Sequence, residues 1–81
     1  MTKSQLQEHL YTIIEQIAPE ADLSTLSPEA DIREALSIDS FDHLNILIGL
    51  HEALGVEIPE SDAGQLTTVD AIVQYLAARV D

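Results

Sequence analysis

The sequence predicts an all-α fold, a small four-helix bundle with three long helices and one short helix. Three stretches place apolar residues three and four positions apart, the spacing that gathers them on one face of a helix. The alternating pattern of a strand occurs only at residues 56–58, which is too short to count. With 81 residues, 46% of them hydrophobic, the chain fits a single small domain over residues 1–81.

The first helix is predicted over residues 4–17. Thr2 or Ser4 can cap its start, and Pro19 opposes continuation past Ile17 because the residue before a proline avoids the helical conformation. Its apolar face consists of Leu6, Leu10, Ile13, Ile14 and Ile17.

Residues 18–38 are rich in Ser, Asp and Pro and predict a long loop. A loop of this length inside a small domain is uncommon and usually functional. Four apolar side chains indicate that this loop packs against the core: Leu23, Leu26, Ile32 and Leu36.

The second helix is predicted to start at Asp39 and Ser40 and to end near Leu54. Asp39 is a good N-cap, Asp42 follows three residues later, and Gly55 stands where a C-terminal cap belongs. One broad apolar face is expected to pack on neighbouring helices, and it consists of Ile46, Leu47, Leu50 and Leu54.

Three further apolar residues of this helix, Phe41, Leu44 and Ile48, are then left beside Ser40 as a partly exposed apolar strip. An exposed apolar strip rimmed by charge is a candidate docking surface. The alternative is that the long loop covers the apolar strip.

A short acidic helical turn is predicted over residues 60–63, after Pro59. The last helix is predicted from Thr68 to about Val80, with Thr67 as its cap and Asp70 in its first turn. Its apolar face consists of Val69, Ile72, Val73, Leu76, Ala77 and Val80.

The charge balance narrows the choice of partners. Fifteen acidic residues against three basic ones give a net charge of −12. Such a surface repels phosphates and anionic lipids, so we expect no nucleic acid and no membrane as partner, but proteins with basic docking patches. The chain has no cysteine, which excludes a disulfide, a thiol nucleophile and a Cys-ligated zinc site within it. Without an apolar run behind a basic start or a membrane-spanning stretch, we expect a cytoplasmic protein.

Ser40 lies in the first turn of the second helix. Backbone N–H groups are unpaired there and the helix dipole favours an anion, so a phosphodiester on Ser40 would be well placed. From composition alone the plainer interpretation is stronger: Asp39 and Ser40 only cap the helix.

A resemblance to a known family centres on residues 36–42, Leu-Ser-Ile-Asp-Ser-Phe-Asp. This segment is similar to the attachment motif of acyl carrier proteins, in which a Gly-x-Asp-Ser-Leu-type sequence opens the second helix. The resemblance extends over the whole chain and includes residues 55–59 and 66–69. It implies an acyl-carrier-protein-like fold and a covalent 4'-phosphopantetheine on Ser40, attached from coenzyme A by a separate phosphopantetheinyl transferase.

The resemblance also implies how the work is divided. The thiol of the arm carries acyl groups as thioesters between acyl-loading and acyl-transferring enzymes, while the chain itself is a monomer that is not an enzyme. Asp39 helps to position the metal and cofactor of the transferase, and the chain has no catalytic or metal-ligating residue of its own. The partner-docking residues are Phe41, Asp42, Leu44, Ile48 and Glu52.

Departures from the family pattern leave the cargo open. Phe41 replaces the usual leucine, and Ser37 stands where the family often has glycine. The second helix has Asn45, Gly49 and His51 among its exposed positions, where carriers of fatty acids are usually dense in glutamate. The pathway is therefore fatty-acid, polyketide or specialised lipid biosynthesis.

Two alternatives stay open. One is an aminoacyl or peptidyl carrier protein of a nonribosomal-type pathway. The other is an unmodified acidic helical adaptor that binds a basic partner through the apolar strip.

Other constellations are weaker. Ser40, Asp42 and His43 are neighbours on one helical turn and point in different directions, so they do not predict a nucleophilic triad. His9, His43 and His51 lack metal-ligand spacing, and we expect each at the surface. The acidic residues lack the pattern of a calcium-binding loop.

Overall fold

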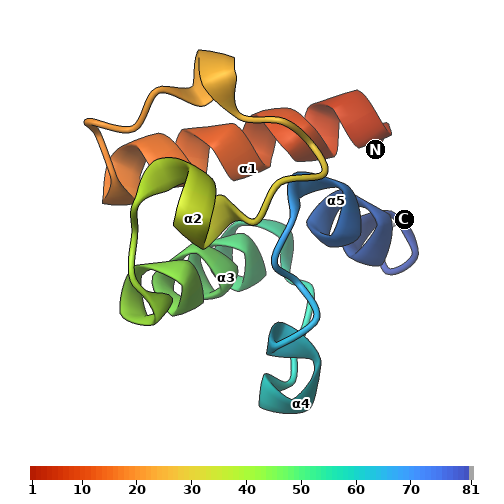
Figure 1. Cartoon of the computed structure of the whole chain (residues 1–81). Coiled ribbons are helices and arrows are strands. Elements are labelled where there is room, and N and C mark those ends of the chain that lie inside the picture. The colour runs from red at the N-terminus through yellow and green to blue at the C-terminus, as the bar shows by residue number, and fades with distance from the viewer. Residues whose placement is uncertain (81) are drawn as a thin grey trace.

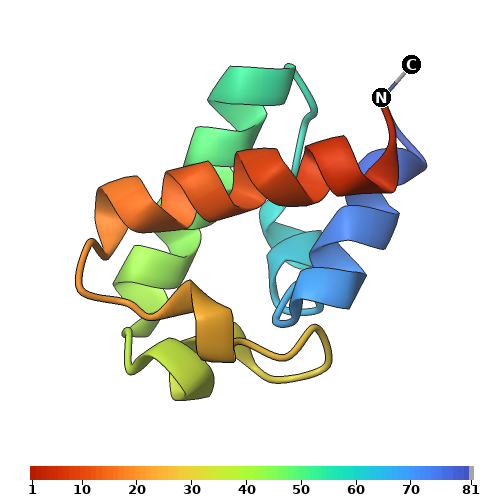
Figure 2. The same ribbon diagram turned by 90° about the horizontal axis from the view of Figure 1, so that it is seen from above.

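Three amphipathic helices form the framework of the structure, a computed structural model that describes residues 1–80. Helix α1 (Lys3–Ile17) packs on both α3 (Ser40–Leu54) and α5 (Val69–Ala77), and crosses over them (Figure 1, Figure 2). Residues 1–80 contain no strand, only an isolated bridge between Asp31 and Thr68. The predicted all-α bundle is confirmed. Its largest fully buried side chains are Leu6, Leu10, Ile14, Ile32, Ile46, Leu50, Val69, Ile72 and Leu76.

The ends of α1 follow the local sequence. Thr2 caps the helix: its hydroxyl accepts a hydrogen bond from the backbone N–H of Gln5 at 3.1 Å. The Gln5 side chain in turn accepts from the Thr2 N–H at 2.8 Å, which completes a capping box. The helix ends at Ile17, two residues before Pro19, as predicted.

The predicted start of the last helix is wrong by one residue. The N-cap of α5 is Thr68, whose hydroxyl accepts from the N–H of Ala71 at 3.0 Å. Thr67 has another role, because its carbonyl accepts from the N–H of Ile32 at 2.8 Å. The helix begins at Val69 and ends at Ala77, three residues short of the predicted end.

The prediction of one long loop over residues 18–38 is partly wrong. A 3-10 turn, η1 (Leu23–Thr25), and a short helix, α2 (Ile32–Leu36), interrupt it. The loop is nevertheless pinned to the core as expected: Leu26 and Ile32 are buried, and the N–H of Asp70 donates to the carbonyl of Pro28 at 3.0 Å. Helix α2 packs on α3 and so lies near its N-terminal end (Figure 1).

The short helix α4 (Glu60–Ala63) lies where the sequence predicts it, below α3 and α5 and away from α1 in Figure 1. The Tyr75 hydroxyl donates to a carboxylate oxygen of Asp62 at 2.7 Å, which ties α4 to α5. Within residues 1–80, no helix combines the length and the apolar content that a membrane span requires.

Candidate functional site

Ser40 is the first residue of α3, and its side chain is exposed. The cap of this helix is Asp39, whose Oδ1 atom accepts from the N–H of Asp42 at 2.8 Å, as predicted. Among residues 1–80, neither the Ser40 hydroxyl nor the N–H groups of Ser40 and Phe41 have a hydrogen-bond partner. Asp39 therefore caps the helix alone and leaves the Ser40 hydroxyl free for chemistry.

The backbone of α3 at this position suits an anion. Helix α3 has 15 residues, and its dipole places partial positive charge at the end where Ser40 lies. The two unpaired N–H groups of its first turn add to this effect. A phosphodiester joined to the Ser40 oxygen is thus more stable here than at the middle or the C-terminal end of the helix.

A pocket of about 230 Å³ opens beside Ser40, and we call it the Ser40 pocket. Its walls come from α2, from the first two turns of α3, and from α4 with the loop that follows it. The residues that line it include Arg33, Ser40, His43, Leu44, Ala63 and Thr67.

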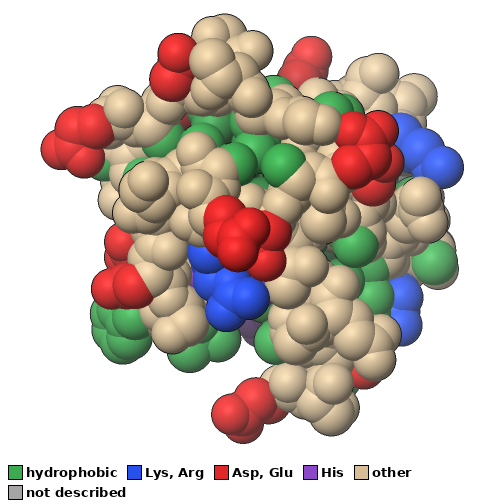
Figure 3. Space-filling view, viewed as in Figure 1, with side chains coloured by type: hydrophobic (Ala, Val, Ile, Leu, Met, Phe, Trp, Pro, Cys, Tyr) green, Lys and Arg blue, Asp and Glu red, His purple; other side chains and the backbone are tan. Residues whose placement is uncertain are grey.

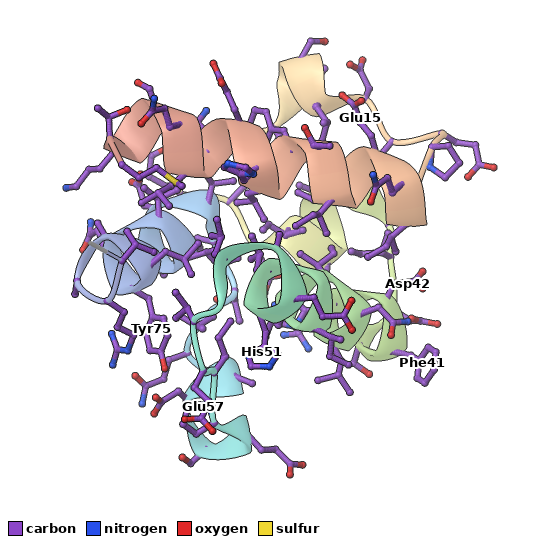
Figure 4. The ribbon with its side chains drawn as sticks, turned by 180° about the vertical axis from the view of Figure 1, so that it is seen from behind. Glu15, Phe41, Asp42, His51, Glu57 and Tyr75 are labelled. Atoms are coloured by element: carbon purple, nitrogen blue, oxygen red, sulfur yellow. The ribbon has the colours of Figure 1, made fainter. Side chains whose placement is uncertain are left out.

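A larger apolar groove of about 450 Å³ lies between α3 and α4, and we call it the α3–α4 groove. Leu44, Leu47, Glu60 and Ala63 line both hollows, so the two adjoin. Ile48 and Ile58 add apolar surface to the groove, while His51 and Glu57 lie at its polar edge. Figure 4 shows His51 and Glu57 on the side of α3 that faces α4. A flexible arm on Ser40 has space along this side of the molecule.

The apolar strip is exposed as the helical spacing predicts. Phe41, Leu44 and Ile48 are 69%, 43% and 44% exposed, so the loop before α3 does not cover them. Phe41 points away from the body of the molecule at the start of α3, next to Asp42 (Figure 4). Glu52 is exposed near the other end of the helix, and Asp42 is half-buried. That partners dock on these five residues stays a prediction.

Three positions of α3 that were expected at the surface are less exposed: His43 is buried, and Asn45 and Gly49 are half-buried. His43 is only 7% exposed, because it faces the loop after α4, where its Nε2 atom lies 2.6 Å from the carbonyl oxygen of Leu66. Gly49 faces α1 and lies so close to Ile13 that the helix has no room for a side chain there. The His43 ring binds the Leu66 carbonyl, and in the part of the chain that the structure describes no hydrogen bond joins this ring to the Ser40 hydroxyl.

The other two histidines are exposed as predicted. The Nδ1 atom of His51 is 2.8 Å from the carbonyl oxygen of Val56, so this ring fixes the turn after α3. Within residues 1–80, no three His, Asp or Glu side chains gather closely enough to hold a metal ion.

Sequence reasoning missed one residue of the site, Arg33. It lies on α2, a helix that the sequence does not predict, and the packing of α2 on α3 brings it into the Ser40 pocket. Its only sequence signal is its rarity, since the chain has three basic residues.

Comparisons with known proteins bear on this site. The family model described as "Phosphopantetheine attachment site" matches residues 8–76, which include Ser40 and nearly all of the helical framework. The chain belongs to the acyl carrier protein family.

Relatives named acyl carrier protein support the same assignment. The chain is 44% identical over 55 residues to one from Rubrobacter xylanophilus, a match that covers 68% of each chain. It is 34% identical over 77 residues to one from Cyanidioschyzon merolae, covering 94% of this chain and 82% of the relative. It is 32% identical over 81 residues to one from Thermosynechococcus vestitus, covering 99% and 98%.

The cofactor of an acyl carrier protein, 4'-phosphopantetheine, fits the residues around Ser40. The group needs a free and accessible hydroxyl for its phosphodiester, and the Ser40 hydroxyl is both. It needs stabilisation of one negative charge, which the first turn of α3 offers. It also needs room for a long arm, which the Ser40 pocket and the α3–α4 groove provide.

Proposed function

We propose that the chain carries acyl groups as thioesters on a 4'-phosphopantetheine arm attached to Ser40. The observation that carries this proposal is the free, exposed hydroxyl of Ser40 at the first residue of α3. Asp39, directly before it, caps the helix with its own carboxylate and makes no use of that hydroxyl. The names of the relatives favour an acyl cargo over an aminoacyl or peptidyl one.

Attachment requires a separate phosphopantetheinyl transferase with coenzyme A as donor. The Ser40 oxygen attacks the phosphorus next to the pantetheine part, and a new P–O bond forms. The bond from that phosphorus to the nucleotide breaks, so the nucleotide leaves as adenosine 3',5'-bisphosphate. The hydroxyl proton passes to a base of the transferase, because no basic side chain among residues 1–80 is hydrogen-bonded to the Ser40 hydroxyl.

Asp39 assists this transfer by helping the transferase to hold its metal and cofactor. Its Oδ1 atom caps α3, while its other oxygen has no partner among residues 1–80. The carboxylate can therefore offer one oxygen outward without giving up the cap.

After attachment, the thiol of the arm supplies the thioester chemistry, and the chain itself catalyses nothing. Its residues hold the attachment point of the arm at the start of α3 and provide a surface on which partner enzymes dock. Phe41, Leu44 and Ile48 offer apolar contact, and Asp42 and Glu52 offer charge to partner enzymes with basic patches. We place this function in the cytoplasm and assign it to a monomer.

The test is intact-protein mass spectrometry after incubation with coenzyme A, magnesium and a transferase of broad specificity. The wild-type chain and a Ser61→Ala control, which loses an exposed serine on α4, should each gain one phosphopantetheine. Ser40→Ala should gain none. A folded wild-type chain that gains no mass would favour the adaptor alternative, in which Ser40→Ala leaves partner binding intact.

A further inference from the structure

Arg33 and Ser40 come from different helices but line the same pocket. The chain turns sharply between them: Ser37 has a left-handed backbone with φ of 55°, and the N–H of Ile38 donates to the carbonyl of Arg33 at 3.1 Å. This turn folds α2 back onto α3. Figure 3 shows basic side-chain atoms just below the position of α2, toward α3, with acidic atoms above them and a histidine at their lower edge.

This placement is notable because cations are scarce in the chain. All three basic residues lie in the part that the structure describes. Lys3 is at the start of α1, and Arg79 stacks on the ring of Tyr75, with 3.5 Å between its Cζ atom and the ring centroid. Arg33 alone of the three lines the Ser40 pocket.

A phosphodiester on Ser40 would enter a negatively charged neighbourhood. The carboxylates of Asp39 and Asp42 lie within two residues of it. A cation in the same pocket offsets the added charge, and a guanidinium suits a phosphate because it can donate two parallel hydrogen bonds.

Arg33 has donors to spare for such a contact. Its Nη2 atom is 3.5 Å from Oδ2 of Asp31, and no other side chain among residues 1–80 binds its guanidinium. Five N–H groups are available on a guanidinium, so the pair with Asp31 leaves several unused. Its side chain is 42% exposed, which leaves it free to turn toward Ser40.

We infer that the Arg33 guanidinium binds the phosphodiester of the arm on Ser40 and thereby directs the arm into the Ser40 pocket. This inference rests on the proposed attachment at Ser40. It makes Arg33 a positioning residue: the arm lies along the side of α3 that faces α4, rather than extending into solvent from the helix end. Release of the contact by a partner's own cation would free the arm for delivery.

The test uses the loaded full chain and NMR spectroscopy. Wild type, Arg33→Gln, Arg33→Lys and the control Arg79→Gln are each loaded from coenzyme A, and mass spectrometry verifies the attachment. The two methyl groups of the pantetheine arm lie next to its phosphate. In wild type they should show nuclear Overhauser contacts to the methyl groups of Ala63 and Thr67, which line the pocket.

Arg33→Gln should weaken these contacts at least threefold and shift the phosphorus resonance of the phosphodiester. Arg33→Lys should retain part of the effect, and Arg79→Gln should match wild type. Asp31→Asn keeps Arg33 and keeps a good cap for α2, so it should also match wild type. In wild type, about 1 M salt should weaken the contacts as well, because the Debye length is then only about 3 Å and the attraction between the guanidinium and the phosphodiester is screened.

Each other result has a definite meaning. Failure of all variants to load would overturn the proposed attachment rather than the role of Arg33. Loaded Arg33→Gln with the contacts and phosphorus shift of wild type would overturn the inference. The same change in Arg79→Gln or Asp31→Asn would also overturn it, because general charge or the fold of α2 would then be the cause.

Discussion

The Nε2 atom of His43 lies 2.6 Å from the carbonyl oxygen of Leu66, and both residues are buried. A carbonyl oxygen only accepts hydrogen bonds, so Nε2 carries the hydrogen that joins the two. The bond connects the second turn of α3 to the segment between α4 and α5. It therefore fixes one wall of the Ser40 pocket, to which His43 itself contributes.

Replacing His43 tests this link. His43→Ala removes the buried ring and leaves the Leu66 carbonyl without its donor, so the free energy of unfolding should fall by about 2–4 kcal/mol. Urea unfolding followed by circular dichroism measures the change. The control His9→Ala, at an exposed position of α1, should stay within about 0.5 kcal/mol of wild type. Equal losses in both variants would contradict a special role for His43.

Much of the framework could be predicted because its signals are local. The caps Thr2 and Asp39, the helical end at Gly55 and the apolar faces of the long helices depend on residues within one or two turns of each other. The exposure of Phe41, Leu44 and Ile48 follows in the same way from their spacing on α3. The position of Ser40 in the first turn needed no tertiary information either.

The errors lie where distant segments meet. Helix α2 has only five residues, too few for a periodic signal, and it is held by contacts with α3 and by the Ile32–Thr67 hydrogen bond. The burial of His43 depends on Leu66, which is 23 residues away. The role of Arg33 depends on the same tertiary packing. The spacing of residues along one helix predicts neither the formation of α2 nor the burial of His43 nor the position of Arg33.

Ser37 provides a test of backbone strain at the turn before the site. Its φ of 55° is in the left-handed region, which costs a residue with a side chain about 1 kcal/mol or more compared with glycine. Ser37→Gly should therefore raise the free energy of unfolding by about 0.5–1 kcal/mol, net of the greater entropy of glycine in the unfolded chain. Thermal and urea unfolding measure it.

The matched control is the same substitution inside a helix. Ser61→Gly on α4 should lower the free energy of unfolding by about 0.5 kcal/mol, because glycine is the poorer helix former. Effects of the same sign in the two variants would show that strain at Ser37 is not the cause.

Gly49 sets how closely α3 approaches α1. A Cβ atom there would lie 2.9 Å from Cγ2 of Ile13, a methyl group on a buried side chain, so the side chain or the helix would have to shift. Overpacking costs about 1–3 kcal/mol, and the helical gain of alanine over glycine returns only about 1 kcal/mol, so Gly49→Ala should destabilise the fold. Gly64→Ala, where nothing lies within 4 Å of the added atom, should be neutral or stabilising in the same unfolding measurement. Equal stability of the two variants would contradict this close approach.

The apolar strip should act in docking and not in folding. Phe41→Ala should raise the KM of a phosphopantetheinyl transferase for this carrier about tenfold, because an exposed aromatic ring is a strong anchor at protein interfaces. Its free energy of unfolding should stay within about 0.5 kcal/mol of wild type. Gln16→Ala, at an exposed site of α1, should alter neither quantity. An unchanged KM for Phe41→Ala, Leu44→Ala and Ile48→Ala would exclude the strip as the docking surface for that enzyme.

The Asp31–Arg33 pair predicts a pH dependence below the ordinary carboxyl range. Partial burial alone would raise the pKa of Asp31, but the hydrogen bonds from the Arg33 N–H and guanidinium outweigh it and hold this pKa below 3.8. A lowered pKa in the folded state means that the charged form stabilises the fold. That contribution is fully present above pH 3.8 and is lost as the pH falls through the lowered pKa.

Arg33→Gln should therefore move the pKa of Asp31 upward, which an NMR titration of its carboxyl carbon measures. The stability difference between wild type and Arg33→Gln should be present at neutral pH and shrink as the pH falls below 3.8. Glu29 is the internal control, since the Ser27 hydroxyl at 2.6 Å is the main cause of its lowered pKa and is unaffected by the substitution. If Asp31 titrates identically in both proteins, the guanidinium does not interact with it in solution, and all its donors are available to the phosphodiester.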